Sequence, residues 1–345
     1  MYRTLASRSA LVFATLALPG VASAHEVYVL AANQIAVDTT EPPFDMIAVA
    51  LQNMHQFAFW AFIGLLAVFI VFFISILHPV ERTMGPFLAR MKRRAPAVAR
   101  VTVGIALLAG AYYQASFGPE LPLRSTFGAF TPLITIVLVA LGFSMIFNVL
   151  TRWSAAIALL LYAVTFYFHG SYMLTYTNYV GEFIVLLIGA HHGYRFSKST
   201  LDRILNALAP YSFAILRVCF GFSLLFASLY AKILHNNLAL QVATVPLAGH
   251  TFGIAHYLGF EPHFLVLGAA IIEIVIALFF MLGVEIRFTS LFLEFWLMLS
   301  LLYFGESVWP HLILIGIPIA LFIHGYDRVS LEGRFFSKGD REPVF

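Results

Sequence analysis

The stretch that decides the fold runs from Phe264 to Val284, reads FLVLGAAIIEIVIALFFMLGV, and contains one charged residue, Glu273. At about 1.5 Å per helical residue it is about 30 Å long, which matches the hydrocarbon core of a bilayer. The whole chain has this character, because 61% of its 345 residues are hydrophobic and 11% are charged. Soluble domains carry about 25% charged residues. We therefore expect an all-α bundle of membrane-spanning helices.

Working outward from this stretch, the sequence predicts nine membrane-spanning helices. The predicted spans are 54–77, 98–117, 129–150, 154–169, 178–193, 211–234, 264–284, 288–304 and 310–324. Basic residues test this count, because they concentrate in cytoplasmic loops. With residue 25 outside, most arginines and lysines fall on the inner side, whereas Arg124 and Lys232 fall on the outer side. We expect a multi-pass protein of a bacterial-type inner membrane, with an outer N-terminus and a cytoplasmic C-terminus.

The N-terminal residues 1–24 are typical of a secretory signal peptide. Arg3 and Arg8 precede a short apolar run, and Ala22-Ser23-Ala24 supplies small residues at the cleavage positions. Cleavage there would begin the mature chain at His25. The remaining segments outside the helical units are an extracytoplasmic leader at 25–53, a first helix with a basic cytoplasmic loop at 54–97, and a cytoplasmic tail at 336–345.

A self-comparison indicates two related four-helix units, 98–210 and 211–335. The matching marks are Arg100 and Gly104 with Arg217 and Gly221, Arg152 with Arg287, and His192-Gly193-Tyr194 with His324-Gly325-Tyr326. Arginines recur at inner helix ends for topological reasons alone, but three matches in the same order favour a tandem duplication. Because each unit has an even number of spans, the two units would share one orientation, as a parallel repeat.

The second unit resembles the DoxX/DoxD superfamily of small four-helix membrane proteins. The resembling motifs are Arg217-x-x-x-Gly221 leading to Lys232, Gly268-Ala-Ala-Ile-Ile-Glu273, Leu282-Gly283 running to Arg287, Trp309-Pro-His311, and His324-Gly325. The chain departs from the pattern at Leu229, where a glycine is usual, and in the long loop 235–263. Some members form the membrane subunit of thiosulfate:quinone oxidoreductase. The resemblance therefore implies a connection with quinone.

Acidic residues within the predicted spans are candidate catalytic groups, because a charge at this depth is costly unless it is paired or hydrated. Glu273 and Glu182 fall in the outer half of the membrane, and a carboxylate there suits quinone chemistry, which moves protons with electrons. Hydrogen bonding between helices is the alternative role for both. Glu294 lies deeper toward the inner side, where we expect it to pair with Arg287 or Asn148.

The histidines form a second group of candidates. Neutral imidazole binds Zn, Cu, Fe and Ni, and five outer histidines are candidate metal ligands: His25, His55, His250, His256 and His263. The free amine and ring of His25 would together suit copper. The alternative for these residues is the amphipathic bilayer interface. The single cysteine excludes a multi-thiolate site, and any haem would be non-covalent, because the chain has no CxxCH motif.

Four further residues are candidate cofactor-binding groups: His169, Arg217, Trp309 and His311. A cluster of tyrosines also lies at the outer ends of the fourth and fifth spans and comprises Tyr162, Tyr167, Tyr172, Tyr176 and Tyr179. These tyrosines form either an interfacial aromatic belt or the mouth of a quinone pocket.

Three functions remain open at this point. The first is an integral subunit of a quinone-linked oxidoreductase, with its quinone site near the outer leaflet and an extracytoplasmic or membrane redox partner protein. The second is outer-face binding or transport of a transition metal such as copper. The third is a non-catalytic membrane scaffold for a partner complex. Nucleic-acid binding is not expected, because no basic surface interleaved with aromatics lies outside the bilayer.

Overall fold

The computed structural model describes residues 41–189, 200–246, 251–304 and 308–336. In these ranges the chain is helical and contains no β-strand, which confirms the predicted all-α class. The predicted signal peptide, most of the leader and the C-terminal tail lie outside the described residues.

The apolar helices match the predicted spans. The long ones are α5 (Phe57–Lys92), α6 (Ala95–Tyr113), α8 (Thr131–Phe147), α9 (Thr151–His169), α10 (Thr177–Gly189), α12 (Ser212–Leu229), α15 (Pro262–Leu282), α16 (Ile286–Phe304) and α17 (Leu312–His324). Seven stretches of the described chain are long and apolar enough to cross a membrane, and one of them, Thr151–Gly189, contains both α9 and α10. A shorter apolar helix covers Trp309–His324. The protein is therefore a multi-pass membrane protein, and the count of nine crossings stays a prediction.

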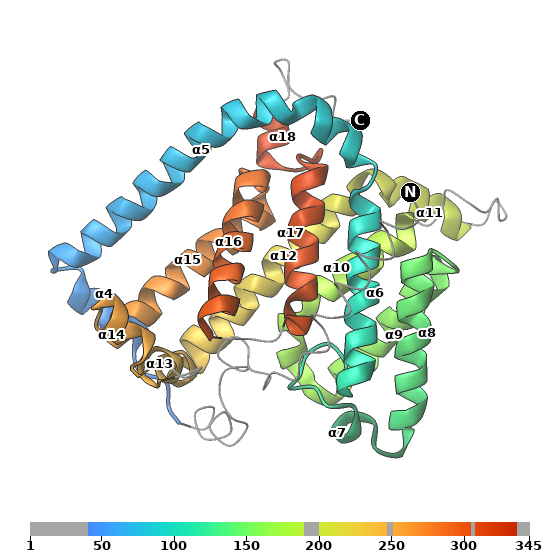
Figure 1. Cartoon of the computed structure of the whole chain (residues 1–345), viewed down its shortest axis with the longest axis horizontal. Coiled ribbons are helices and arrows are strands. Elements are labelled where there is room, and N and C mark those ends of the chain that lie inside the picture. Colours follow the sequence, from blue (N-terminus) through green and yellow to red (C-terminus); the bar gives the residue numbers. More distant parts are fainter. Residues whose placement is uncertain (1–40, 190–199, 247–250, 305–307, 337–345) are drawn as a thin grey trace.

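Short elements join these helices at the two ends of the bundle (Figure 1). They are α4 (Met46–Asn53), α7 (Leu123–Phe127), η1 (Gly128–Phe130), η2 (Gly170–Tyr176), α11 (Thr200–Leu208), η4 (Ala209–Tyr211), η5 (Tyr230–Leu234), α13 (Asn236–Thr244), α14 (Ile254–Leu258), η6 (Trp309–His311) and α18 (Leu331–Phe336). We call the end with α7, α13 and α14 the α13 face, and the opposite end, with α11 and α18, the α18 face.

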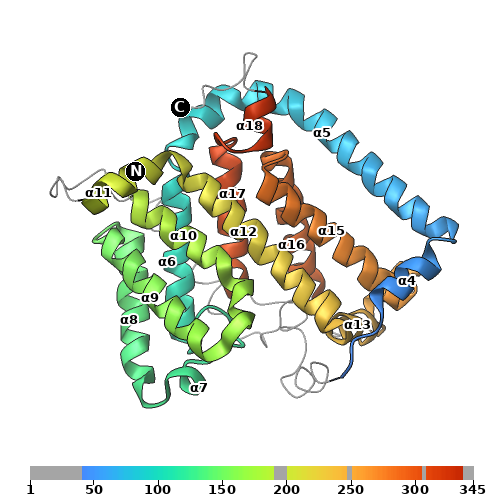
Figure 2. The same cartoon turned by 180° about the vertical axis from the view of Figure 1, so that it is seen from behind.

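The two predicted units interlock at the centre of the bundle. Within them, α6 packs on α8 and α12 packs on α15. Between them, α10 of the first unit packs on α12 of the second, and α17 of the second packs on α6 of the first. Figure 2 shows α10 and α12 running side by side from behind. Each unit therefore places its last helix against the first helix of the other.

The matching arginines of the two units make the same backbone contacts. Nη1 of Arg100 donates to the carbonyls of Met145 and Ile146 at the end of α8. Nη1 of Arg217 donates to the carbonyls of Phe280 and Met281 at the end of α15. The last carbonyls of a helix have no partner within the helix, and a cation offsets their partial negative charge. In both units an arginine on the first helix therefore caps the second.

The matching glycines allow the capped helices to approach closely. A Cβ atom on Gly104 would lie 2.9 Å from the carbonyl oxygen of Gly142 in α8, and one on Gly221 would lie 2.7 Å from that of Ala277 in α15. Small residues at such positions let membrane helices come into backbone contact. The glycine of each pair is therefore required by the closeness of the two helices.

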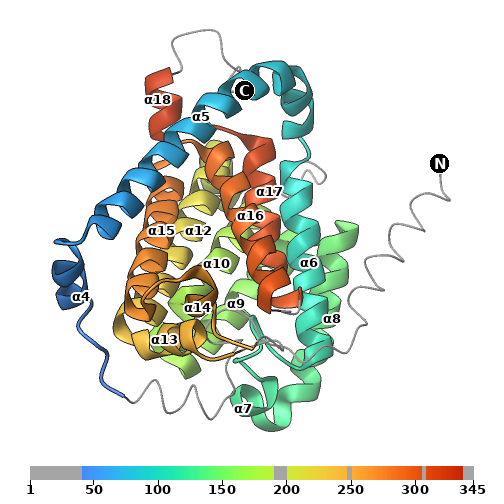
Figure 3. The same cartoon turned by 60° about the vertical axis from the view of Figure 1, so that its left-hand side comes forward.

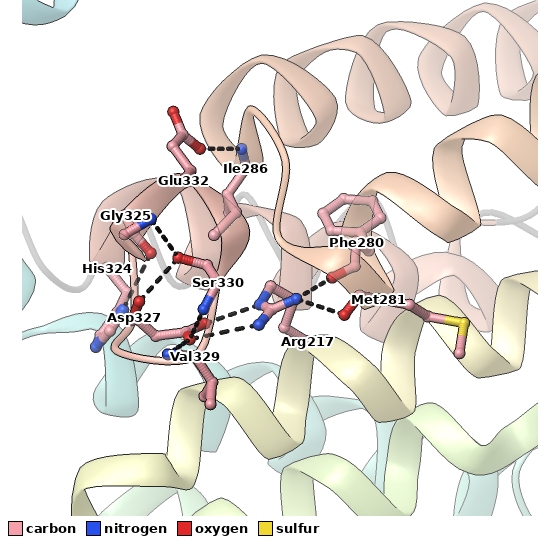
Figure 4. Close-up of polar contacts among 11 residues, drawn as sticks. Arg217, Phe280, Met281, Ile286, His324, Gly325, Asp327, Val329, Ser330 and Glu332 are labelled. Atoms are coloured by element: carbon pink, nitrogen blue, oxygen red, sulfur yellow. Dashed lines mark hydrogen bonds and ion pairs between the residues drawn. The ribbon is translucent and has the colours of Figure 1, made fainter. Parts of the chain in front are cut away.

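The Arg217 cap is reinforced by the segment that follows α17 (Figure 4). Asp327 accepts from Nε of Arg217 at 2.8 Å, and both side chains are at least 96% buried. The same carboxylate accepts from the backbone N–H groups of Val329 and Ser330 at 2.9 and 2.8 Å. The N–H of Ile286 donates to Glu332 at 3.4 Å. These bonds hold α18 against the junction of α15 and α16.

Helix α5 lies at the edge of the bundle and leans away from it (Figure 3). Near the α18 face, Glu81 of α5 lies 3.7 Å from Nη1 of Arg287 and accepts from the hydroxyl of Tyr326 at 3.2 Å. Toward the α13 face, the ring of Phe62 packs edge-on against Phe264 of α15, with centroids 6.0 Å apart. Between these two points, Phe69 and Phe73 pack on Phe292 and Phe288 of α16, so α5 contacts the second unit at several places along its length.

Candidate functional site

A cavity of about 120 Å³ lies between the two units, toward the α13 face. Its walls come from η2, α10, α12, η5, α15, α16, η6 and the start of α17, together with Glu120 from the loop after α6. The lining residues are Glu120, Tyr172, Thr175, Tyr176, Asn178, Tyr179, Ser223, Leu224, Ala227, Tyr230, Ala231, Lys232, Glu273, Ile276, Leu293, Trp296, Leu297, Pro310 and Leu314. Both units are therefore needed to form it.

An ion pair between Lys232 and Glu273 lies in the wall from the second unit. The ammonium Nζ lies 2.9 Å from Oε2 of Glu273, and the lysine side chain is 6% exposed and the glutamate 23%. Lys232 belongs to η5, a turn of π-helix at the end of α12. Such turns carry an extra residue within a helix and occur frequently at functional sites. The sequence-predicted catalytic residue Glu273 thus faces the cavity beside a buried cation.

A second carboxylate, Glu120, lies in the wall from the first unit. Its Oε1 accepts hydrogen bonds from the hydroxyls of Tyr172, at 2.9 Å, and Tyr176. Tyr179, one turn along α10, donates instead to the carbonyl of Phe117 at 3.1 Å. These contacts draw the loop after α6 over η2 and hold Glu120 at the cavity. Three of the five clustered tyrosines therefore line this pocket, whereas Tyr167 is 83% exposed on the surface.

The remaining walls are apolar and aromatic. Ile276 of α15 and Leu293, Trp296 and Leu297 of α16 line one side, and Leu224 and Ala227 of α12 line another. An apolar surface that carries a few well-placed polar groups is typical of sites for small organic molecules. The pocket suits a flat, amphipathic ring.

Glu182, the other predicted catalytic residue, does not line the cavity. Its side chain is fully buried in α10, three residues beyond Tyr179. Neither of its carboxylate oxygens has a hydrogen-bond partner among the described residues. Because residues three apart lie on one face of a helix, Glu182 lies about one turn deeper than the cavity wall. Its role stays a prediction.

The prediction that Glu294 pairs with Arg287 or Asn148 is wrong. Oε1 of Glu294 is buried without a hydrogen-bond partner in the described part of the chain. Arg287 instead contacts Glu81 and the carbonyl of Phe322, and the amide oxygen of Asn148 accepts from Thr151. On α16, Glu294 lies two turns, about 10 Å, beyond Arg287, and the guanidinium turns instead toward Glu81 of α5 and the end of α17.

The predicted cofactor-binding residues are dispersed. Arg217 lies at the opposite end of α12, about 22 Å from Lys232 along the helix, where it caps α15. The indole of Trp309 is buried and stacked on Tyr113, with centroids 5.0 Å apart, and His311 is fully buried two residues later. His169 shares a hydrogen bond of 2.8 Å with Thr126. None of the four side chains lines the cavity, although Pro310, between Trp309 and His311, does.

The predicted metal-binding histidines are not gathered in the described parts of the chain. His55 and His256 are exposed, and Nδ1 of His263 lies 2.6 Å from Oε1 of Glu261. In these parts no three histidine, cysteine or acidic side chains lie close enough together to hold a metal ion. His25 and His250 lie outside the described residues. Copper or haem binding by this chain therefore stays a prediction.

Sequence reasoning did not identify Glu120 or Lys232 as site residues. Lys232 carried a usable signal, since it is an ionisable residue at the end of an apolar stretch on the side with few basic residues. Glu120 carried none, because its place in the cavity depends on how the loop after α6 folds back onto η2. No family model, curated protein or solved structure matches this chain.

Proposed function

We propose that this protein binds the ring of a quinone in the cavity between its two units and acts as the membrane subunit of a quinone-linked oxidoreductase. The observation that carries the proposal is the combination of two carboxylates and a lysine with aromatic and apolar walls inside a membrane bundle. The resemblance of the second unit to DoxX-like proteins, which we retain as a proposal, is in line with it.

The cavity fits one ring of this kind. An apolar cavity of about 150 Å³ in another protein binds benzene, so the 120 Å³ found here is close to the size of one six-membered ring. A quinone ring is apolar on its faces and carries polar oxygens at its edge. The aromatic and aliphatic walls suit the faces, and the polar groups of Lys232, Glu273, Glu120 and the tyrosines suit the oxygens.

A quinone supplies two-electron redox chemistry that is coupled to two protons. The residues of the chain provide for the proton part: the Lys232 ammonium donates hydrogen bonds to a ring carbonyl, whereas the carboxylates of Glu273 and Glu120 accept them from ring hydroxyls. The pairing of Glu273 with Lys232 and of Glu120 with Tyr172 holds both carboxylates in place before a ligand arrives. We assign the first proton transfers to Glu273 and Glu120.

We place the α13 face outside the cytoplasm and propose nine crossings in two parallel units. Basic residues support this orientation, because they gather at the end of α5, the start of α6 and the other helix junctions of the α18 face, whereas Arg124 and Lys232 lie toward the α13 face. The arginine caps and close glycines that recur in both units support the duplication. The cavity would then lie in the outer half of the membrane, within reach of an extracytoplasmic redox partner.

Quenching of the fluorescence of Trp296 tests the proposed function, because this indole lines the cavity. We expect a substituted benzoquinone to quench the emission of the purified protein in a saturable manner, and the Trp296→Phe variant to lose that saturable part. Glu273→Gln and Glu120→Gln should weaken binding about tenfold or more, as is usual when a hydrogen bond to a charged group is lost.

Glu294→Gln is the matched control, because Glu294 is also a largely buried carboxylate within the membrane bundle but does not line the cavity. It should bind quinone as the wild type does. Quenching that does not saturate, or that persists unchanged in Trp296→Phe, would refute the proposal. Equal losses in Glu294→Gln and Glu273→Gln would also count against it, since they would point to general destabilisation.

A further inference from the structure

We propose that the apolar groove between α5 and the pair α15–α16 holds the polyprenyl tail of the same molecule whose ring occupies the cavity. This inference rests on the proposed function and names the substrate class more narrowly, as a quinone with a polyprenyl tail. The tail would lie on the lipid-facing side of the second unit, and the ring would lie on the side that faces the first unit.

The groove is a second hollow, separate from the cavity. Leu66 and Ile70 of α5 form its outer wall, and Ile272, Phe279, Phe288 and Phe292 form much of the rest. Its lining is apolar except for Thr289. Phe62 and Glu81 attach α5 to the second unit on either side of the groove. Between them, Phe69 and Phe73 of α5 pack on Phe292 and Phe288 of α16, with ring centroids 5.5 and 6.3 Å apart, whereas the middle of α5 makes few contacts with α15.

The groove and the cavity lie on opposite sides of one wall, where α15 and α16 make limited contact; we call this place the seam. Ile276 of α15 lines both hollows. On α16, Leu293 lines the cavity and its neighbour Phe292 lines the groove. The contact between α15 and α16 is much less extensive than that between α15 and α12. We therefore place the way from the cavity to the bilayer between α15 and α16, beside Ile276, where it ends under α5.

This continuity decides which occupant suits the groove. The acyl chain of a bilayer lipid would also fill an apolar groove, but its headgroup would stay at the membrane surface and have no reason to meet the cavity. A ring joined to a polyprenyl chain matches both hollows at once: the ring meets the polar groups near Lys232, and the chain meets the apolar residues on α5, α15 and α16. The seam beside Ile276 is where the two parts of the molecule join.

A tail-length series tests the inference. The ligands are benzoquinones with no tail and with tails of one, two and three isoprene units. Their binding is measured by Trp296 quenching at constant detergent concentration. Affinities are expressed as mole fractions of ligand in the micelle, so that the greater partitioning of longer tails into detergent cancels. We expect the wild type to bind the two-unit ligand at least about threefold more tightly than the tailless ring, through the added packing contacts of the tail.

Ile70→Trp and Val71→Trp form a matched pair on α5. The side chain of Ile70 lines the groove, whereas that of Val71 is 64% exposed on the outer surface. Ile70→Trp should remove the gain from the tail and leave the affinity for the tailless ring unchanged. Val71→Trp should leave both unchanged. Each added indole raises the fluorescence background, so both variants are also made in the Trp296→Phe background to measure it.

The outcomes separate this inference from the proposed function. No saturable binding of the tailless ring would refute the proposed function and this inference with it. Binding of the ring with no gain from a tail, or the same loss of the gain in both α5 variants, would overturn the tail site alone. As a second measurement, a diazirine on the second isoprene unit should label peptides from 66–70, 272–279 and 288–292, and labelling spread over all lipid-facing helices would contradict the assignment.

Discussion

Replacing Arg217 with methionine should destabilise the protein far more than the same replacement of Arg100. Both arginines cap the next helix of their unit through two carbonyls. Arg217 is in addition almost completely buried and paired with Asp327. Removing one partner of a buried ion pair costs about 3–5 kcal/mol, because the other charge stays buried. Arg100 is partly exposed and pairs with no described carboxylate, so its loss should cost about 1–2 kcal/mol.

The free energy of unfolding can be measured by titrating each purified variant from a mild detergent into sodium dodecyl sulfate and following helicity by circular dichroism. Arg217→Met should lower it by about 2–3 kcal/mol more than Arg100→Met does. Combining Arg217→Met with Asp327→Leu should restore part of the loss, since the isolated carboxylate is removed. Equal losses for the two arginines, or a double variant as unstable as the sum of its single changes, would refute the reasoning.

Three further changes test other parts of the structure. Burial raises the pKa of Glu332 from 4.5 to about 8, so between these pH values the folded protein keeps a proton that the unfolded chain releases. The contribution of the protonated carboxyl to the free energy of unfolding is therefore complete below about pH 4.5 and is lost as the pH rises toward about 8. Glu332→Gln should flatten this part of the pH dependence of thermal unfolding. Gly221→Val should separate α12 from α15 and lower stability by about 1–3 kcal/mol, which the same detergent titration measures; a neutral effect would show that the helices can shift apart. Glu261 caps the start of α15 through the N–H of Phe264 at 2.8 Å, so Glu261→Ala should cost about 1 kcal/mol and speed amide hydrogen exchange in the first turn of α15, whereas unchanged exchange there would argue against the cap.

The helices could be predicted because their signal is local. A run such as Phe264–Val284 is apolar over the full thickness of a bilayer, and α15 covers Pro262–Leu282. The sequence did not indicate that α5 would extend to Lys92, far beyond the predicted end at residue 77. The basic residues after residue 77 end the apolar run, but they do not end the helix, because lysine and arginine are good helix formers and the end of α5 bends over the α18 face (Figure 1).

The site could be predicted only where a single residue was informative by itself. Glu273 is one acid within an apolar stretch, so the cost of its charge in the membrane is enough to make it a candidate from the sequence alone. The same reasoning selected Glu182, which is buried outside the cavity. In both cases the sequence predicts the depth of the residue along its helix. Which neighbouring helix or cavity the side chain faces depends on how the helices pack, and the sequence does not show this directly. That information lies in contacts between α10 and α12 and between α15 and α12, which are distant in sequence.

The two units, if they arose by duplication as we propose, agree where they hold the fold and differ where they form the cavity. The arginine caps and the close glycines are present in both. Counted back from the matched pair Arg152 and Arg287, the position of Glu273 corresponds to Leu138 in the first unit, which is fully buried. An equivalent cavity formed with the roles of the two units exchanged would therefore lack the carboxylate that pairs with lysine. Two units of one ancestry can thus interlock symmetrically and still enclose a single polar site, with Glu120 contributed by one unit and the Lys232–Glu273 pair by the other.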